Sequence, residues 1–193
     1  MPEENKNNQP NLYSAKEMKK VLQTSEIALW LETYDDIFSD FDPRPYAQRA
    51  LSDDFLLEAM KASRDRGQDS CELKFLIAPE VRSHTHESVI KKRLHDYFIK
   101  QHHIFEKERK GIIKKGFLFI ISGVLLMLIG TLISVFYLGK HFIFSFLVVL
   151  IEPAGWFLFW EGLNHAIYES KRNSPNLNFY KKMSKCKISF LSY

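Results

Sequence analysis

Cysteine and glycine are both scarce in this sequence, and each scarcity excludes a class of protein. The two cysteines, Cys71 and Cys186, stand far apart in 193 residues. They form neither a disulfide framework nor a paired metal-ligand motif, so we expect reduced thiols. The eight glycines build no phosphate-binding loop, and no Gly-x-Ser-x-Gly turn occurs. The sequence therefore gives no sign of a nucleotide-binding enzyme or a serine hydrolase of these common types.

Charge is missing from two long stretches in the second half of the chain. Gly116–Gly139 has 24 consecutive residues without charge, and Phe142–Trp160 has 19 residues with one charge, Glu152. About 20 apolar residues are enough to cross the hydrocarbon core of a bilayer as a helix. A soluble domain of this size cannot bury two helices that are apolar all round. The sequence predicts a transmembrane hairpin with spans at 116–138 and 142–160.

Positive charge is distributed unevenly along the chain. Residues 1–78 carry a net charge of −5, and residues 79–193 carry +9. The surplus of lysine and arginine flanks the outer ends of the two predicted spans, whereas the turn between them has Lys140 alone. The positive-inside rule therefore predicts that both termini lie in the cytoplasm. The basic flanks also predict contact with anionic lipid headgroups rather than nucleic acid.

Glu152 and Pro153 interrupt the second apolar run near its predicted midpoint. A charged side chain at the bilayer centre costs roughly 2.5–3.5 kcal/mol even on lenient scales. Proline leaves the carbonyl of Val149 without its helical partner. One interpretation is a kinked helix that holds a neutral acid. The other is a site where Glu152 binds protons or cations. We expect Glu152 at the depth of Met127 and Leu128, without a cationic partner in the first span.

Small residues recur at helical spacing in both spans. They are Gly123, Gly130 and Ser134 in the first span and Gly155 in the second. Small side chains let two membrane helices approach closely. These four residues are therefore candidates for helix packing, within the hairpin or between subunits.

The remaining sequence predicts an α+β cytosolic domain with a small sheet of about three strands and two helices. Alternation indicates strands at 26–34 and 71–78 and at the C-terminus, 186–193, which we expect to join the 71–78 strand. Ser52 is a predicted N-cap for a helix over 53–63. The predicted organisation is a tail (1–24), the cytosolic domain (25–85), a basic stalk helix (86–115), the hairpin (116–160), and a helix extension with a C-terminal strand (161–193).

Two groups of polar residues resemble metal ligands. Asp35, Asp36, Asp40 and Asp42 form a DDxxxDxD pattern, whose carboxylates could hold a divalent cation. The pattern lacks the glycine and distal glutamate of a calcium loop, and aspartate in loops more often caps turns. The histidines, with His-x-His at His84 and His86, have no cysteine ligands beside them. We therefore predict no metal, no cofactor and no catalytic residue.

The segments SDFDPRPY, ALSDDF and EPAGWFLFWEGL, together with the basic helix and two spans, resemble a family of small prokaryotic two-span membrane proteins. The resemblance covers roughly residues 25–193. It implies a bacterial or archaeal inner (plasma) membrane protein and carries over no activity, because the family has none established.

Three functions follow from these observations. The first is a non-enzymatic membrane module that forms a homo-oligomer or binds a membrane partner protein. The acidic stretch 25–60 could then dock on a basic stalk. The second is a small ion channel or a proton- or cation-coupled transport subunit that uses Glu152. The third is a membrane-bound enzyme with a carboxylate metal site at the aspartates.

Overall fold

The computed structural model describes residues 27–64, 72–137, 139–172 and 174–192. Two compact units make up the chain. The first spans Met1–His102 and Asn178–Tyr193, and the second spans His103–Leu177. The predicted N-terminal tail, 1–24, lies outside the described residues. Among the described residues, most are helical, and a small sheet accompanies the helices.

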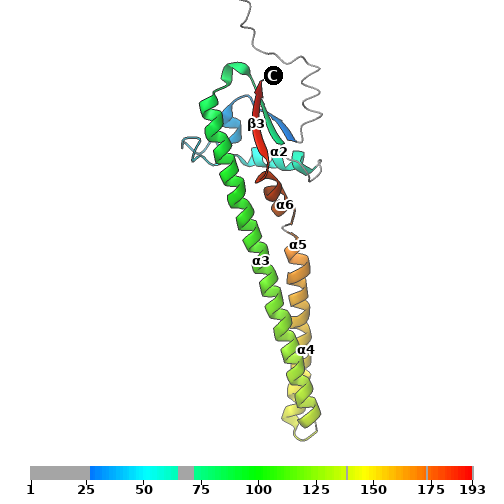
Figure 1. The fold of residues 1–193 in the computed structure, drawn as a ribbon. Helices are drawn as coiled ribbons and strands as arrows, with labels where there is room; N and C mark the ends of the chain where they lie inside the picture. Colours follow the sequence, from blue (N-terminus) through cyan, green and yellow to red (C-terminus); the bar gives the residue numbers. More distant parts are fainter. Residues whose placement is uncertain (1–26, 65–71, 138, 173, 193) are drawn as a thin grey trace, which may run out of the picture. The chain divides into compact units, whose positions relative to one another are not determined.

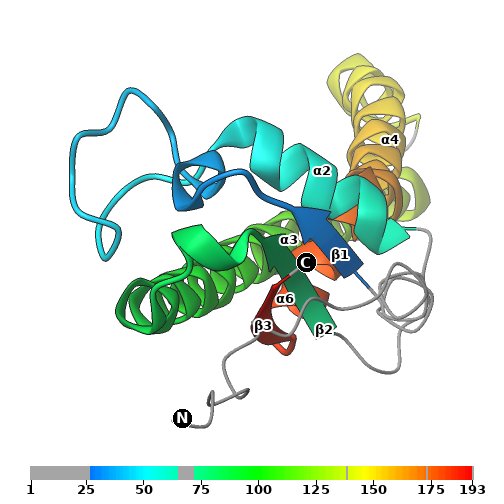
Figure 2. The same cartoon turned by 90° about the horizontal axis from the view of Figure 1, so that it is seen from above.

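Three parallel strands form the sheet of the first unit, in the order β1-β2-β3 (Figure 2). Their bounds are Ile27–Trp30 for β1, Glu72–Ile77 for β2 and Lys187–Ser192 for β3. The predicted pairing of the C-terminal segment with the central strand is confirmed, with Glu72 opposite Lys187. Parallel neighbours require helical crossovers. The expected α+β domain is therefore a βαβ arrangement, in which α2 makes the first crossover.

The first strand is shorter than its predicted range, 26–34, because a side-chain cap takes over after Trp30. The carboxylate of Asp36 accepts hydrogen bonds from the backbone N–H groups of Glu32, at 2.7 Å, and Thr33, at 3.0 Å. These bonds start a 3₁₀ turn over Tyr34–Ile37. An aspartate that binds nearby backbone in this way competes with strand pairing.

Aromatic side chains form the core between the sheet and the helices that cover it. Helix α2 (Asp53–Arg64) begins after Ser52, whose Oγ accepts a hydrogen bond from the N–H of Phe55 at 3.5 Å. The Phe55 ring lies 5.9 Å from that of Phe75 on β2, and Phe75 lies 5.0 Å from Phe190 on β3. Burying such side chains contributes about 1.5–3 kcal/mol each.

Helix α3 runs from His84 to Tyr137, and its first turns belong to this core. Ile90, Leu94 and Phe98 are each fully buried. Their i, i+4, i+8 spacing places them on one face of the helix. The predicted stalk, 86–115, thus divides at His102 between the two units.

The second unit consists of the later part of α3 and a second long helix (Figure 1). The second helix is α4 (Phe142–Leu163), followed by a π-helical segment (Asn164–Glu169), α5 (Ser170–Arg172) and the start of α6 (Ser174–Met183). The helical run formed by α4, the π-helical segment and α5 is unbroken from Phe142 to Arg172, as predicted. Both long helices have the length and apolarity to cross a membrane.

The expectation of reduced thiols is wrong for Cys186, which is disulfide-bonded and buried. The other cysteine of the sequence, Cys71, lies outside the described residues. Distance along the chain suggested two isolated thiols.

Candidate functional site

Four glycines line the contact between α3 and α4. Gly116 and Gly123 lie on α3, and Gly155 and Gly162 lie on α4, and the members of each pair are seven positions apart. A Cβ added to Gly123 would lie 2.7 Å from the carbonyl oxygen of Gly155, and one added to Gly162 would lie 2.6 Å from the backbone nitrogen of Ile120. Such distances leave no room for a side chain. We call these four residues the glycine seam.

The structure places two of the four predicted packing residues, Gly123 and Gly155, in the glycine seam. Gly130 continues the row, because a Cβ there would lie 3.1 Å from Cγ2 of Ile151. Ser134 is half-buried further along α3. Sequence reasoning missed Gly116 and Gly162. Their seven-residue offset from Gly123 and Gly155 is the signal that could have revealed them, since seven residues are close to two helical turns.

Glu152 and Pro153 lie beside this contact, not in it. Both side chains are exposed in the structure. The Cγ atom of Glu152 lies 3.7 Å from the position that a Cβ would take on Gly130. Helical side chains lean toward the N-terminus of their helix, so Glu152 extends along α4 toward Gly130. Among the described residues, no lysine, arginine or histidine lies within ion-pair distance of Glu152.

Three of the four aspartates in the DDxxxDxD pattern have partners within the chain. Asp36 caps the 3₁₀ turn, as described above. Asp35 forms an ion pair with Arg49 at 2.5 Å. Asp42 accepts hydrogen bonds from the Arg44 side chain, at 2.7–3.1 Å, and from the backbone N–H of Ala50, at 2.6 Å.

The guanidinium of Arg44 and the N–H of Ala50 hold the pKa of the Asp42 carboxyl well below its usual range. The last member of the pattern, Asp40, is exposed. Asp35, Asp36 and Asp42 thus bond to nearby groups of the chain. A cation would have to displace those bonds to use them as ligands.

The two histidines of the His-x-His pattern point to different surroundings. His84 is exposed, and its Nδ1 lies 3.8 Å from Glu87. The His86 ring packs edge-on against Tyr34 and Tyr46, with ring centroids 6.0 and 5.4 Å away. Both histidines are exposed, and their ring nitrogens have different neighbours: a carboxylate for His84 and aromatic rings for His86.

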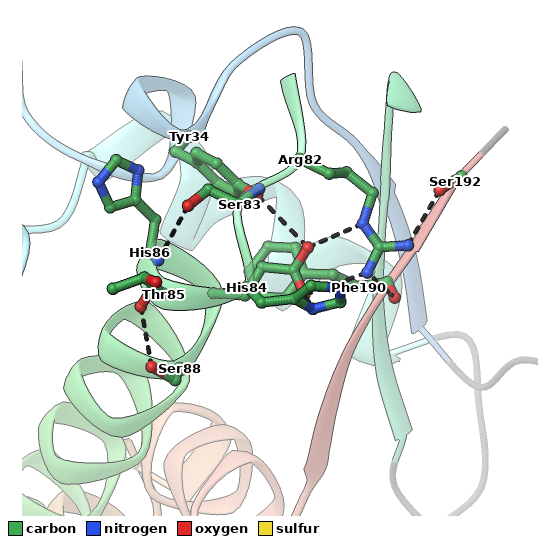
Figure 3. A network of polar contacts seen from close by, with 10 residues as sticks. Tyr34, Arg82, Ser83, His84, Thr85, His86, Ser88, Phe190 and Ser192 are labelled. Atoms are coloured by element: carbon green, nitrogen blue, oxygen red, sulfur yellow. Dashed lines mark hydrogen bonds and ion pairs between the residues drawn. The ribbon is translucent and has the colours of Figure 1, made fainter. Parts of the chain in front are cut away.

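A buried ion pair at the start of α3 was not anticipated from the sequence. Glu87 is 3% exposed, and Arg82 binds it through two hydrogen bonds of 2.8 and 3.1 Å. Arg82 also donates to the hydroxyl of Ser192, at 2.9 Å, and to the carbonyl oxygen of Phe190, at 3.3 Å (Figure 3). The pair therefore ties the start of α3 to the end of β3.

Tyr34, the first residue of the 3₁₀ turn after β1, also belongs to this network. Its hydroxyl accepts a hydrogen bond from the N–H of Ser83, at 2.8 Å, and donates to Glu87, at 3.4 Å (Figure 3). Burial, followed by the neighbouring Glu87 carboxylate, raises the pKa of Tyr34. The hydrogen bonds to Glu87 raise the pKa of Arg82. Tyr34, Arg82 and Glu87 each have hydrogen-bond partners, as buried polar groups in folded proteins usually do.

Among the described residues, a groove lies along the C-terminal end of α4 and the π-helical segment. Its volume is about 360 Å³. Its lining residues are Phe157, Trp160, Glu161, Leu163, Asn164, Ile167 and Tyr168. Aromatic rings with a few polar groups are typical of the membrane–water interface.

No family model, curated protein or solved structure matches this chain. Function must therefore be inferred from the structure itself. Its main features are a parallel βαβ unit with a buried ion pair and two long apolar helices that contact each other through glycines.

Proposed function

We propose that this protein is a non-enzymatic integral membrane module that assembles with itself through its two apolar helices. The position of Glu152 carries the proposal. The glycine seam occupies the contact within the helix pair, so the carboxyl lies on the outer surface, where a second copy of the chain can reach it.

The burial pattern supports a membrane environment for the helix pair. In the most apolar window of each helix, 11% of the residues are buried. Large side chains such as Phe117, Leu125, Val135, Phe142 and Phe157 are more than half exposed. Soluble monomers rarely expose a continuous apolar surface of this extent. Lipid is the solvent that suits it, and the pair would then be a transmembrane hairpin.

The distribution of lysine and arginine supports the cytoplasmic side for both termini and for the sheet unit. Lys107, Arg109, Lys110, Lys114 and Lys115 are all exposed on α3 just before the first apolar run. Each would gain about 1 kcal/mol near an anionic membrane surface. The same residues support anionic lipid headgroups as partners of the basic flanks.

The proposed assembly is tested by the mass of the particle in lipid nanodiscs at several protein-to-disc ratios. Glu152→Gln keeps a hydrogen-bonding group, so its association should match the wild type. Glu152→Leu removes it and should weaken association about three- to thirtyfold, since an interhelical hydrogen bond contributes about 0.6–2 kcal/mol in membranes. Leu150→Ala is the control, because Leu150 lies two residues before Glu152 and so on nearly the opposite side of α4. A particle that stays monomeric at every ratio would contradict the proposal.

Proton- or cation-coupled transport through Glu152 is the second candidate, favoured by the same exposed carboxyl. Proteoliposomes with a pH-sensitive dye inside distinguish it from simple assembly. Flux that disappears in Glu152→Gln, while the particle mass is unchanged, would favour transport.

A further inference from the structure

The groove at the C-terminal end of α4 faces away from the glycine seam. Gly162 and Ala166 face α3, because a Cβ added to Gly116 would lie 2.8 Å from the Gly162 carbonyl oxygen and 2.8 Å from the Ala166 nitrogen. Asn164 lines the groove two positions after Gly162, roughly 200° further around the helix. All the lining residues belong to α4 and the π-helical segment. The groove is therefore open on the side of the helix that α3 does not cover.

The lining of the groove combines aromatic rings with one carboxylate and one amide. Phe157, Trp160 and Tyr168 are each more than half exposed, and Glu161 and Asn164 supply the polar side-chain atoms. The volume, about 360 Å³, falls within the range of roughly 300–1,000 Å³ that small-molecule sites occupy. Carboxylates and the faces of aromatic rings both attract positive charge. This lining therefore suits a cationic group.

The negative charge beside the groove does not depend on the protonation of His165. The Nε2 atom of this histidine lies 3.4 Å from Oε1 of Glu161, and its Nδ1 atom lies 2.5 Å from Oε2 of Glu169. Two carboxylates outweigh one imidazole whether or not the ring is charged. Among the described residues, no lysine or arginine forms an ion pair with either glutamate. The groove thus keeps a net negative edge.

The place of the groove along the chain indicates where the cation comes from. The groove begins in the last apolar residues of the run 142–160 and ends before Lys171 and Arg172, which are exposed. If α4 crosses a bilayer, this is the level of the lipid headgroups. A phospholipid brings apolar chains and a phosphate together with its headgroup cation. The chains suit Phe157, and the phosphate suits the two basic residues that follow.

The polar atoms of the groove favour a primary ammonium over a quaternary one. A primary ammonium has three N–H donors, which the carboxylate of Glu161 and the side-chain oxygen of Asn164 can accept. A quaternary ammonium has no N–H group and would leave both acceptors without a hydrogen bond. An ethanolamine headgroup therefore fits this lining better than a choline headgroup.

We propose that the groove binds the headgroup of a phospholipid with a primary ammonium, phosphatidylethanolamine. Glu161 and Asn164 accept hydrogen bonds from the ammonium, the Trp160 ring lies against it, and Phe157 contacts the start of an acyl chain. This inference rests on the membrane location given under the proposed function. It does not rest on self-assembly or on Glu152.

Native mass spectrometry of the full chain in detergent tests the site by titration with phosphatidylethanolamine, phosphatidylcholine and phosphatidylglycerol of identical acyl chains. Phosphatidylethanolamine should bind about threefold or more tightly than either of the others, because it alone can donate to both acceptors. Glu161→Gln should weaken its binding about tenfold, since a hydrogen bond to a charged group is lost, and should leave phosphatidylcholine binding unchanged. Glu108→Gln removes the same charge from an exposed position on α3 and should keep the preference intact.

Equal affinities of the wild type for the three lipids would overturn the proposal, as would an unchanged preference in Glu161→Gln. If Glu161→Gln fails to fold, Asn164→Leu decides. It removes the other acceptor and should weaken phosphatidylethanolamine binding about two- to tenfold, and an unchanged affinity contradicts the site. Failure of the membrane location gives a different result, because the chain would then be extracted from vesicles by alkaline carbonate. A chain that stays in the vesicles but binds the three lipids equally overturns the lipid site alone.

Discussion

Gly123 and Gly155 face each other across α3 and α4 so closely that a Cβ on Gly123 would lie 2.7 Å from the Gly155 carbonyl oxygen. The contact is backbone against backbone. It explains how two helices with bulky apolar side chains on most faces still approach closely. It also fixes which faces remain on the outside, and thus where Glu152 lies.

Replacing Gly123 with leucine should push α3 and α4 apart. Overpacking of a tight contact costs typically 1–3 kcal/mol, so the melting temperature of the detergent-solubilised protein should fall. Gly111→Ala is the matched control, because a Cβ at Gly111 meets nothing within 4 Å. That change should stabilise the helix by up to about 1 kcal/mol. Equal effects of the two variants would show that the seam does not matter.

Glu87→Gln should destabilise the sheet unit by about 3 kcal/mol, because it leaves Arg82 without its charged partner in a part-buried site. Denaturant unfolding followed by circular dichroism measures the loss. The exposed pair Glu58–Lys61 provides the comparison, with Lys61 Nζ 2.7 Å from Oε1 of Glu58. Glu58→Gln should change stability by less than 1 kcal/mol. A Glu87→Gln effect as small as this would contradict the structural role of the buried pair.

Asp42 should contribute to stability at neutral pH and lose this contribution in acid. Its pKa in the folded state is lowered by Arg44 and the Ala50 N–H, so stability is present above the unfolded-state value, near 4, and declines as pH falls below it. Asp42→Asn should lower the midpoint of thermal unfolding at pH 7, and the difference from wild type should shrink toward pH 2. Asp40→Asn should match the wild type throughout. A constant difference at all pH values would refute the linkage.

Removing β3 should destabilise the first unit strongly. Phe190 is 5% exposed, and Phe190→Ala alone should cost about 3–5 kcal/mol. Deletion of residues 187–193 also removes two acceptors of Arg82 and should abolish the cooperative unfolding transition of this unit. Ser192→Ala, which removes one hydrogen bond, should cost about 1 kcal/mol. If the deletion left the transition in place, the last strand would not be part of the core.

Reporter fusions should place residues 1 and 193 in the cytoplasm and residue 140 outside, as the lysine distribution predicts. The disulfide at Cys186 makes this measurement informative, because disulfides persist mainly in oxidising compartments. An extracytoplasmic signal from both termini would reverse the proposed orientation. It would agree with the compartment that the disulfide favours.

Local pattern in the sequence determined several features of this protein. The uncharged runs predicted two long apolar helices, because the length and apolarity of a run can be read from consecutive residues. The alternation of Leu73, Phe75 and Ile77 predicted a strand for the same reason, and Ser52 predicted the start of α2. The candidates Gly123 and Gly155 were visible as small residues, although not as partners of each other.

Tertiary structure alone decided how these elements meet. The parallel pairing of β2 with β3 and the contact of Gly123 with Gly155 join segments that are distant in the chain. The ion pair of Arg82 and Glu87 depends on the directions of the two side chains, and it lies beside Ser192 from the distant C-terminal strand. The outward position of Glu152 follows from the contact of the two glycines. Local propensity fixes the period of a helix or strand, but the partner is chosen by packing of whole faces, which no short window of sequence contains.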